Sequence, residues 1–136
     1  MIILWDASPS AGERYRFALG GDAQVLTAAP MVARALHDNP HVTEVVIGPE
    51  VPLEQACDLA ESTRLDRREL GVILLRPRLD VTALAQALRS GVREVVPADD
   101  HTALSDALRR SRALTVRLAG HLAGSASTSC RATRST

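Results

Sequence analysis

The sequence contains no lysine, and all 16 of its cationic side chains are arginine. A phosphate loop of the form G-x-x-x-x-G-K-[ST] is therefore excluded from this chain, because that motif depends on its lysine. The arginines are balanced by 16 aspartates and glutamates, and no basic run stands out. This charge pattern gives no electrostatic footprint for nucleic acid or for a membrane surface. Codon usage is a simpler reason for the missing lysine than recognition.

Aromatic and sulfur-bearing residues are also scarce. One Trp, one Tyr and one Phe leave a core of Leu, Val, Ile and Ala, and give few stacking platforms for single-stranded nucleic acid. The two cysteines, Cys57 and Cys130, are far apart, and Cys57 is expected in the core. The histidines lie in different predicted elements: His37, His41, His101 and His121. We therefore predict no metal site and no cofactor.

Long hydrophobic runs are absent as well. No run approaches the roughly 18 apolar residues that suggest a membrane span, and no basic stretch followed by an apolar segment opens the chain as in a signal peptide. We expect a cytoplasmic protein without membrane insertion. Its 136 residues are enough for one domain with a substantial core.

Short apolar runs alternate with amphipathic stretches along most of the chain. The runs suit strands buried on both faces of a parallel sheet, and they cover residues 2–5, 24–27, 42–47, 71–75 and 94–96. The amphipathic stretches predict helices over residues 10–19, 30–37, 52–64, 81–90 and 101–118. Capping residues support their starts: Ser10 with Glu13 in a capping box, Asp80, and Asp99 or Asp100. The fourth helix carries one apolar stripe: Val81, Leu84, Ala85 and Leu88.

Five strands that alternate with five helices predict an α/β fold, a doubly wound, flavodoxin-like parallel sheet of order 2-1-3-4-5. We place the domain at residues 1–118. Residues 119–136 are rich in Ala, Gly, Ser, Thr and Arg without apolar periodicity, and we expect a flexible linker or truncation tail there.

Chemistry in such sheets collects at the carboxyl ends of the strands. In this chain those ends carry Asp6, the run Gly48-Pro49-Glu50, and Arg76. One interpretation pairs Arg76 with Asp6 or Glu50 in a fixed ion pair. The other leaves Glu50 and Arg76 as solvated loop ends.

Three segments together carry a family resemblance: residues 45–53 (VVIGPEVPL), 71–75 (GVILL) and 88–97 (LRSGVREVVP). They are similar to the N-terminal atypical receiver domain of the CpaE/TadZ proteins, the ParA/MinD-like ATPases of Flp (Tad) pilus assembly. The likeness covers about residues 1–118, and its most specific piece is Gly91 to Pro97. Family members often continue into an ATPase domain, so we expect this chain to be the regulatory part alone.

Phosphorylatable receivers supply four groups that can be compared with this chain. Of the paired acids after the first strand, Asp6 is present alone. Gly48 or Pro49 stands where the aspartate nucleophile is expected, and Glu50 is displaced beyond the proline. Arg76 replaces the Ser or Thr after the fourth strand, and no lysine follows the fifth. The resemblance thus implies a vestigial pocket without aspartyl phosphorylation.

The resemblance also implies a role in protein contacts, with recruitment of pilus or secretion machinery to a cell pole. Receivers commonly pair through their fourth helix, fifth strand and fifth helix, which would permit a homodimer. The charged residues on that face form the predicted interface: Arg89, Arg93, Glu94, Asp106, Arg109 and Arg110. A simply solvated helix face is the other interpretation.

Three hypotheses follow from the sequence. The first is a non-enzymatic interaction domain that does not depend on phosphorylation. The second is a response regulator phosphorylated on a displaced carboxylate such as Glu50. The third is a small nucleotide- or cofactor-binding flavodoxin-like domain, which the missing phosphate loop and the few aromatics disfavour.

Overall fold

The computed structural model describes residues 1–21 and 23–135, with side chains through Gly120. Its centre is one parallel sheet of order β2-β1-β3-β4-β5, as predicted. The strands are β1 (Ile2–Trp5), β2 (Ala23–Leu26), β3 (Glu44–Ile47), β4 (Gly71–Arg76) and β5 (Glu94–Pro97). Each connection between paired strands contains a helix, because parallel neighbours require a crossover.

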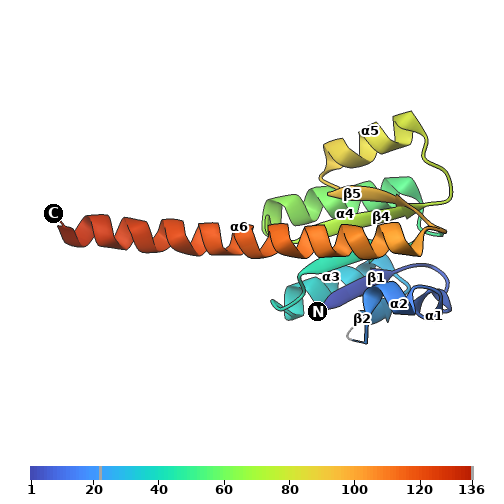
Figure 1. Ribbon diagram of the computed structural model, residues 1–136, viewed down its shortest axis with the longest axis horizontal. Coiled ribbons are helices and arrows are strands. Elements are labelled where there is room, and N and C mark those ends of the chain that lie inside the picture. The colour runs from blue at the N-terminus through green and yellow to red at the C-terminus, as the bar shows by residue number, and fades with distance from the viewer. Residues whose placement is uncertain (22, 136) are drawn as a thin grey trace.

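Helices cover both faces of this sheet (Figure 1). One face carries α3 (Ala29–Asp38), α4 (Leu53–Asp66) and α5 (Val81–Ser90). The other carries α1 (Ala11–Arg14), α2 (Arg16–Leu19) and α6 (His101–Ser135). Successive strand residues point to opposite faces, so each face has its own aliphatic core. In β1, Ile3 and Trp5 enter one core while Ile2 and Leu4 enter the other.

The first predicted helix is divided at Tyr15, which corrects the sequence-based expectation. Tyr15 is buried and leaves helical geometry, with φ −106° and ψ 12°. Its hydroxyl donates to the Ala98 carbonyl at 3.1 Å, and this inward turn separates α1 from α2. The predicted capping box is also wrong. Ser10 makes no capping bond, and its hydroxyl instead pairs with the Ser8 hydroxyl at 2.8 Å.

Other local predictions are confirmed. The Asp80 side chain accepts from the Thr82 N–H at 3.3 Å at the start of α5. Asp100 accepts from the Ala103 N–H at 2.9 Å at the start of α6. Gly91 ends α5 with φ 110°, a left-handed conformation that glycine adopts at little cost. Cys57 is buried, as expected, whereas the Cys130 side chain lies outside the described residues.

The C-terminal helix differs from its predicted extent. We expected its end near Leu118, whereas α6 runs from His101 to Ser135 and extends well past the sheet (Figure 1). No proline follows Pro97, so no residue of this segment lacks the N–H that a continuing helix needs. The linker role assigned to residues 119–136 stays a prediction.

The apolar stripe of α5 is rotated relative to the prediction. Ala87 and Ser90 are buried, and Leu84 is half-buried. Val81 and Leu88, expected in the core, are 79% and 48% exposed. The small residues of the buried row let α5 pack close to α4, and the larger side chains are left outside.

Candidate functional site

The carboxyl edge of the sheet brings Asp6 and Gly48 into contact. Asp6 follows β1 and is 2% exposed, and Gly48 follows β3 next to it. A Cβ built on Gly48 would lie 2.5 Å from Asp6 Cγ, closer than real Cβ contacts. The place of a nucleophilic side chain after β3 is therefore filled by the Asp6 carboxylate. From the sequence we expected the position of the aspartate nucleophile to be empty. The structure shows that the Asp6 side chain fills it.

The loop between β3 and α4 is held from two sides. From one side, Asp6 Oδ1 accepts the Glu50 N–H at 3.0 Å. From the other, Arg76 Nη2 donates to the carbonyls of Pro49 at 2.8 Å and Val51 at 2.7 Å. Charge-assisted bonds of this kind are stronger than those between neutral groups. The loop that follows β3 is thus fixed by one buried acid and one half-buried cation.

This geometry corrects the predicted ion pair. Among the described residues, Arg76 forms no salt bridge with Asp6 or Glu50. The Glu50 side chain is exposed, in agreement with a solvated loop end. Arg76 is not solvated, however, because it binds the loop carbonyls. Neither sequence interpretation anticipated an arginine that binds main chain.

Burial raises the pKa of Asp6 above its ordinary value, more than the hydrogen bond from the Glu50 N–H lowers it. Burial also lowers the pKa of Arg76, although Asp6 and Cys57 oppose that shift. Hard cations such as Mg²⁺ bind clusters of oxygen ligands. Within the described residues, no group of three or more His, Cys, Asp or Glu side chains is placed to hold a metal ion.

Next to β5, the site is covered by the end of α1 and by Tyr15, which contact residues 98 and 99. Arg14 Nη2 lies 2.8 Å from Asp99 Oδ1. The Tyr15 hydroxyl binds the Ala98 carbonyl, directly after β5. The main chain where a receiver lysine would be expected is thus occupied by a tyrosine contact. One signal for this contact was present in the sequence, since Tyr15 is the single tyrosine of a chain poor in aromatics.

Most of the charged residues predicted to form an interface bind other residues of the same chain. Arg110 binds Glu94 through two bonds of 2.6 and 3.2 Å, and Arg109 pairs with Asp106. Arg93 is turned inward, with a side chain 14% exposed, so its placement on an outer face is wrong. Arg89 remains exposed at the end of α5.

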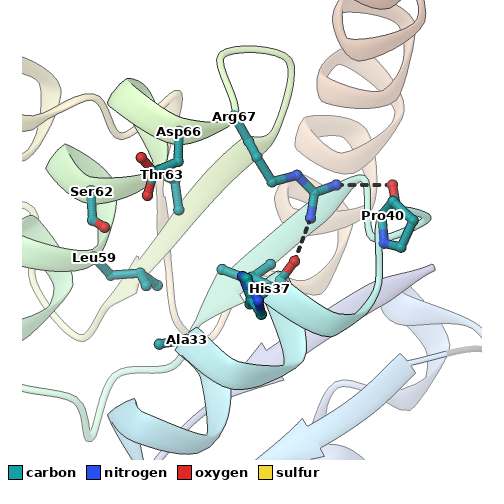
Figure 2. A pocket seen from close by; sticks show the side chains of 9 residues that line it. Ala33, His37, Pro40, Leu59, Ser62, Thr63, Asp66 and Arg67 are labelled. Atoms are coloured by element: carbon teal, nitrogen blue, oxygen red, sulfur yellow. Dashed lines mark hydrogen bonds between the residues drawn. The ribbon is translucent and has the colours of Figure 1, made fainter.

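A groove of about 620 Å³ lies between α3 and α4 (Figure 2), and neither Asp6 nor Gly48 lines it. Leu36 and Leu59 form part of its apolar wall, and His37 and Asp66 lie at its exposed rim. Arg67 closes one end. Its guanidinium donates to four main-chain carbonyls where α3 ends and β3 approaches: those of Leu36, Asn39, Pro40 and Val42. Figure 2 shows two of these bonds.

No family model and no curated protein matches the chain. The receiver domain of an HD domain-containing protein from Pseudomonas fluorescens Pf-5 is similar, with a TM-score of 0.74, 19% identity, and coverage of 85% of this chain and 96% of that one. At these identities the likeness shows the receiver fold.

Two pilus proteins from Burkholderia have the same fold. A pilus assembly-related protein from Burkholderia pseudomallei K96243 has a TM-score of 0.67 and 21% identity, over 83% of this chain and 89% of that one. The pilus assembly protein CpaE from Burkholderia thailandensis E264 has a TM-score of 0.64 and 19% identity, over 82% and 97%. The chain therefore has a receiver fold, and its neighbours include pilus-assembly proteins.

No helix within the described residues combines the length and the apolar character needed to cross a membrane.

Proposed function

We propose that this chain is a non-catalytic receiver-like domain that acts through protein contacts and is not regulated by aspartyl phosphorylation. The observation that carries the proposal is the contact between Asp6 and Gly48. A receiver phosphorylated after its third strand needs a free carboxylate there. In this chain that space holds Asp6, the acid that follows β1, and the adjoining loop is held by Asp6 and Arg76.

The bonds of Arg76 support the same conclusion. Its guanidinium binds two carbonyls of the loop, an arrangement that needs no phosphoryl group to persist. A loop held permanently in one conformation suits a constitutive binding domain better than a switch. We propose that the recognition surface is fixed by the fold.

The proposed partner is a component of a Flp (Tad) pilus or secretion assembly, reached in the cytoplasm and recruited to a cell pole. The resemblance to CpaE/TadZ sequences and the fold shared with the two pilus proteins support this role. The proposed contact surface centres on α5, where Val81 and Leu88 are exposed, and it includes the exposed Leu79 just before the helix. Exposed apolar side chains that gather on one helix are typical of interaction surfaces.

Phosphoryl chemistry provides the test. The protein would be incubated with Mg²⁺ and acetyl phosphate or beryllofluoride, with a phosphorylatable receiver as the positive control. We expect no phosphoryl adduct by mass spectrometry and no specific shift in amide NMR spectra. A specific adduct or a shift centred on residues 48–50 would contradict the proposal.

The same experiment separates the alternative, in which Glu50 accepts a phosphoryl group. Glu50→Gln removes that carboxylate and keeps its size. An adduct that forms on the unmodified chain and disappears in Glu50→Gln would establish the alternative. An adduct that persists would place the acceptor elsewhere and would also overturn our proposal.

A further inference from the structure

A second polar cluster lies at the edge of the sheet opposite Asp6, where β3 begins and α6 leaves the sheet. Glu44 is fully buried, although it opens a strand whose other residues are apolar. Its Oε2 accepts from Ser111 Oγ at 2.6 Å and from Thr115 Oγ1 at 3.4 Å. These donors stand one turn apart on α6. One carboxylate therefore holds two successive turns of the helix.

Arg93 completes the cluster from the turn before β5. Its Nη1 donates to the Ser111 carbonyl and Ser111 Oγ, each at 2.9 Å, and to Thr115 Oγ1 at 2.8 Å. The same nitrogen lies 3.8 Å from Glu44 Oε2. Elements far apart in the sequence are thus joined through one set of buried polar groups.

The sheet leaves room for this cluster at Gly71. Gly71 opens β4 and is the register partner of Glu44. A Cβ built there would overlap Glu44 Oε2 and Ser111 Oγ. The absence of a side chain at residue 71 is therefore what lets the carboxylate and the helix hydroxyl meet.

The Glu44 carboxylate lacks a full set of donors. Its Oε1 has no hydrogen-bond partner among the described residues. A buried oxygen without a partner costs more in a carboxylate than in a neutral carboxyl. Burial raises the pKa of Glu44, and the hydrogen bonds from Ser111 and Thr115 and the charges of Arg93 and Arg112 lower it by less.

Among the described residues, the other elements packed around Glu44 add no further charge that shifts its pKa. The register partners on β1 and β4 are Ile2 and Gly71. Near the start of β4, the Glu69 carbonyl accepts Arg93 Nη2 at 3.3 Å, while the Glu69 carboxylate lies 3.8 Å from Arg67. The charged groups that act on Glu44 are thus Arg93 and Arg112.

The cluster stands where α6 parts from the domain. Thr115 is 3% exposed, and Val116 is 71% exposed. Between Thr115 and Gly120, no further residue of the helix is buried. Beyond this point α6 extends past the sheet (Figure 1). The hold on Ser111 and Thr115 therefore decides how much of α6 stays on the sheet.

We propose that Glu44, Ser111 and Thr115 form a proton-dependent latch for α6. With a proton on Glu44, the latch keeps the helix on the sheet through Thr115. Without it, the cost of burying an ionised Glu44 favours opening of the helix from Ser111 onward, against the three bonds from Arg93. The latch depends on neither phosphorylation nor the proposed partner.

The direction of the effect follows from linkage. A carboxyl group with a raised folded-state pKa stabilises the fold fully below its ordinary pKa of 4.5. That contribution is lost as the pH rises through the raised value. Release of α6 is therefore expected as the pH increases, and closure as it decreases.

Hydrogen exchange of the full chain tests the latch at about pH 5 and about pH 8, with rates corrected for intrinsic exchange. We expect amides 111–120 to lose about tenfold in protection at the higher pH, the equivalent of about 1.4 kcal/mol. Amides of β1 and β3 serve as the internal reference and should change less. Protection at 111–120 that does not depend on pH would overturn the latch.

Three variants sharpen the experiment. Glu44→Gln keeps the shape without the titration and should give equal protection at both pH values. Glu94→Gln removes a half-buried acid that binds Arg110 of the same helix, and its pH response should match that of the unmodified chain. Ser111→Ala keeps Glu44 but deletes its shortest bond, so α6 should be released at both pH values. A full pH response in Glu44→Gln, or full protection at low pH in Ser111→Ala, would overturn the proposal.

Discussion

The carboxylate of Asp6 occupies the space that a side chain at Gly48 would need, with Asp6 Cγ 2.5 Å from the position of a Cβ. Asp6 and Gly48 are 42 positions apart in the sequence, yet the buried Asp6 side chain and a side chain at residue 48 cannot both be accommodated. An acid can be buried after β1 because residue 48 is glycine. Residue 48 must stay glycine for as long as that acid is present.

Gly48→Ala should destabilise the fold by about 1–3 kcal/mol, because overpacking forces the buried Asp6 side chain or the backbone to move. In an Asp6→Gly background the same change should cost much less, since the clashing Asp6 Cβ, Cγ and Oδ1 are all gone. Urea unfolding of the four proteins gives the coupling energy. Additive effects of the two changes would contradict the contact.

Arg76→Met should destabilise the protein by about 2–3 kcal/mol, because it leaves the carbonyls of Pro49 and Val51 without their charged donor. Methionine keeps the length of the apolar stem. Arg78→Met alters an exposed arginine of the following loop and should stay within about 0.5 kcal/mol. Chemical denaturation measures both, and faster hydrogen exchange at residues 49–51 in Arg76→Met alone locates the effect. Equal stabilities of the two variants would show that the bonds from Arg76 to Pro49 and Val51 do not stabilise the fold.

Glu44→Gln should raise the free energy of unfolding near neutral pH by about 1 kcal/mol, since it removes the cost of a buried carboxylate with an unpartnered oxygen. The gain should shrink as the pH falls toward 4.5, where the glutamate itself becomes neutral. Unfolding by urea across this pH range provides the measurement. A variant less stable than the unmodified protein at every pH would show that the ionised pair with Arg93 stabilises the fold.

Arg67→Met should destabilise the protein by about 2–4 kcal/mol, because one guanidinium supplies four carbonyls near the end of α3. Arg68→Met changes the exposed neighbour and serves as the control. Thermal unfolding compares the two. Loss of amide protection at residues 36–42 should accompany the Arg67 change, and protection that is unaffected there would contradict this assignment.

Val81→Gln and Leu88→Gln should leave stability within about 0.5 kcal/mol, because both side chains are largely exposed. Association through α5, with a second copy or with a pilus component, should weaken by at least about tenfold, or 1.4 kcal/mol. Leu65→Gln is the matched control, since Leu65 is 81% exposed on α4. Analytical ultracentrifugation and titration with candidate components measure the loss. If all three changes weaken association equally, α5 is not the contact surface.

The sheet was predictable because each strand is a short apolar run, and a run buried on both faces leaves few alternatives in a chain of this size. The caps at Asp80 and Asp100 were predictable for the same local reason. The arrangement of the α5 face was not. Two apolar rows lie side by side on that helix, and the row of small residues packed inward.

The polar clusters were harder to predict because their partners are distant in sequence. From the sequence alone, Arg93 is predicted to be a surface charge. Only the fold brings Ser111, Thr115 and Glu44 together around it. A signal existed nonetheless, since Glu44 interrupts an apolar strand, and Ser111 and Thr115 share the buried side of α6. Arg76 carried no comparable signal, because its acceptors are carbonyl groups that every sequence possesses.

The placement of α6 has a consequence for synthesis of the chain. Ile2 and Leu4, which leave the ribosome well before α6, share a core with Leu104 and Leu108 of that helix. One face of β1 therefore stays partly uncovered until most of the domain has been translated, because only α1 and α2 can pack on it earlier. At about 5–20 residues per second, that interval lasts several seconds or more. During it, the nascent chain offers aliphatic surface that a chaperone can protect.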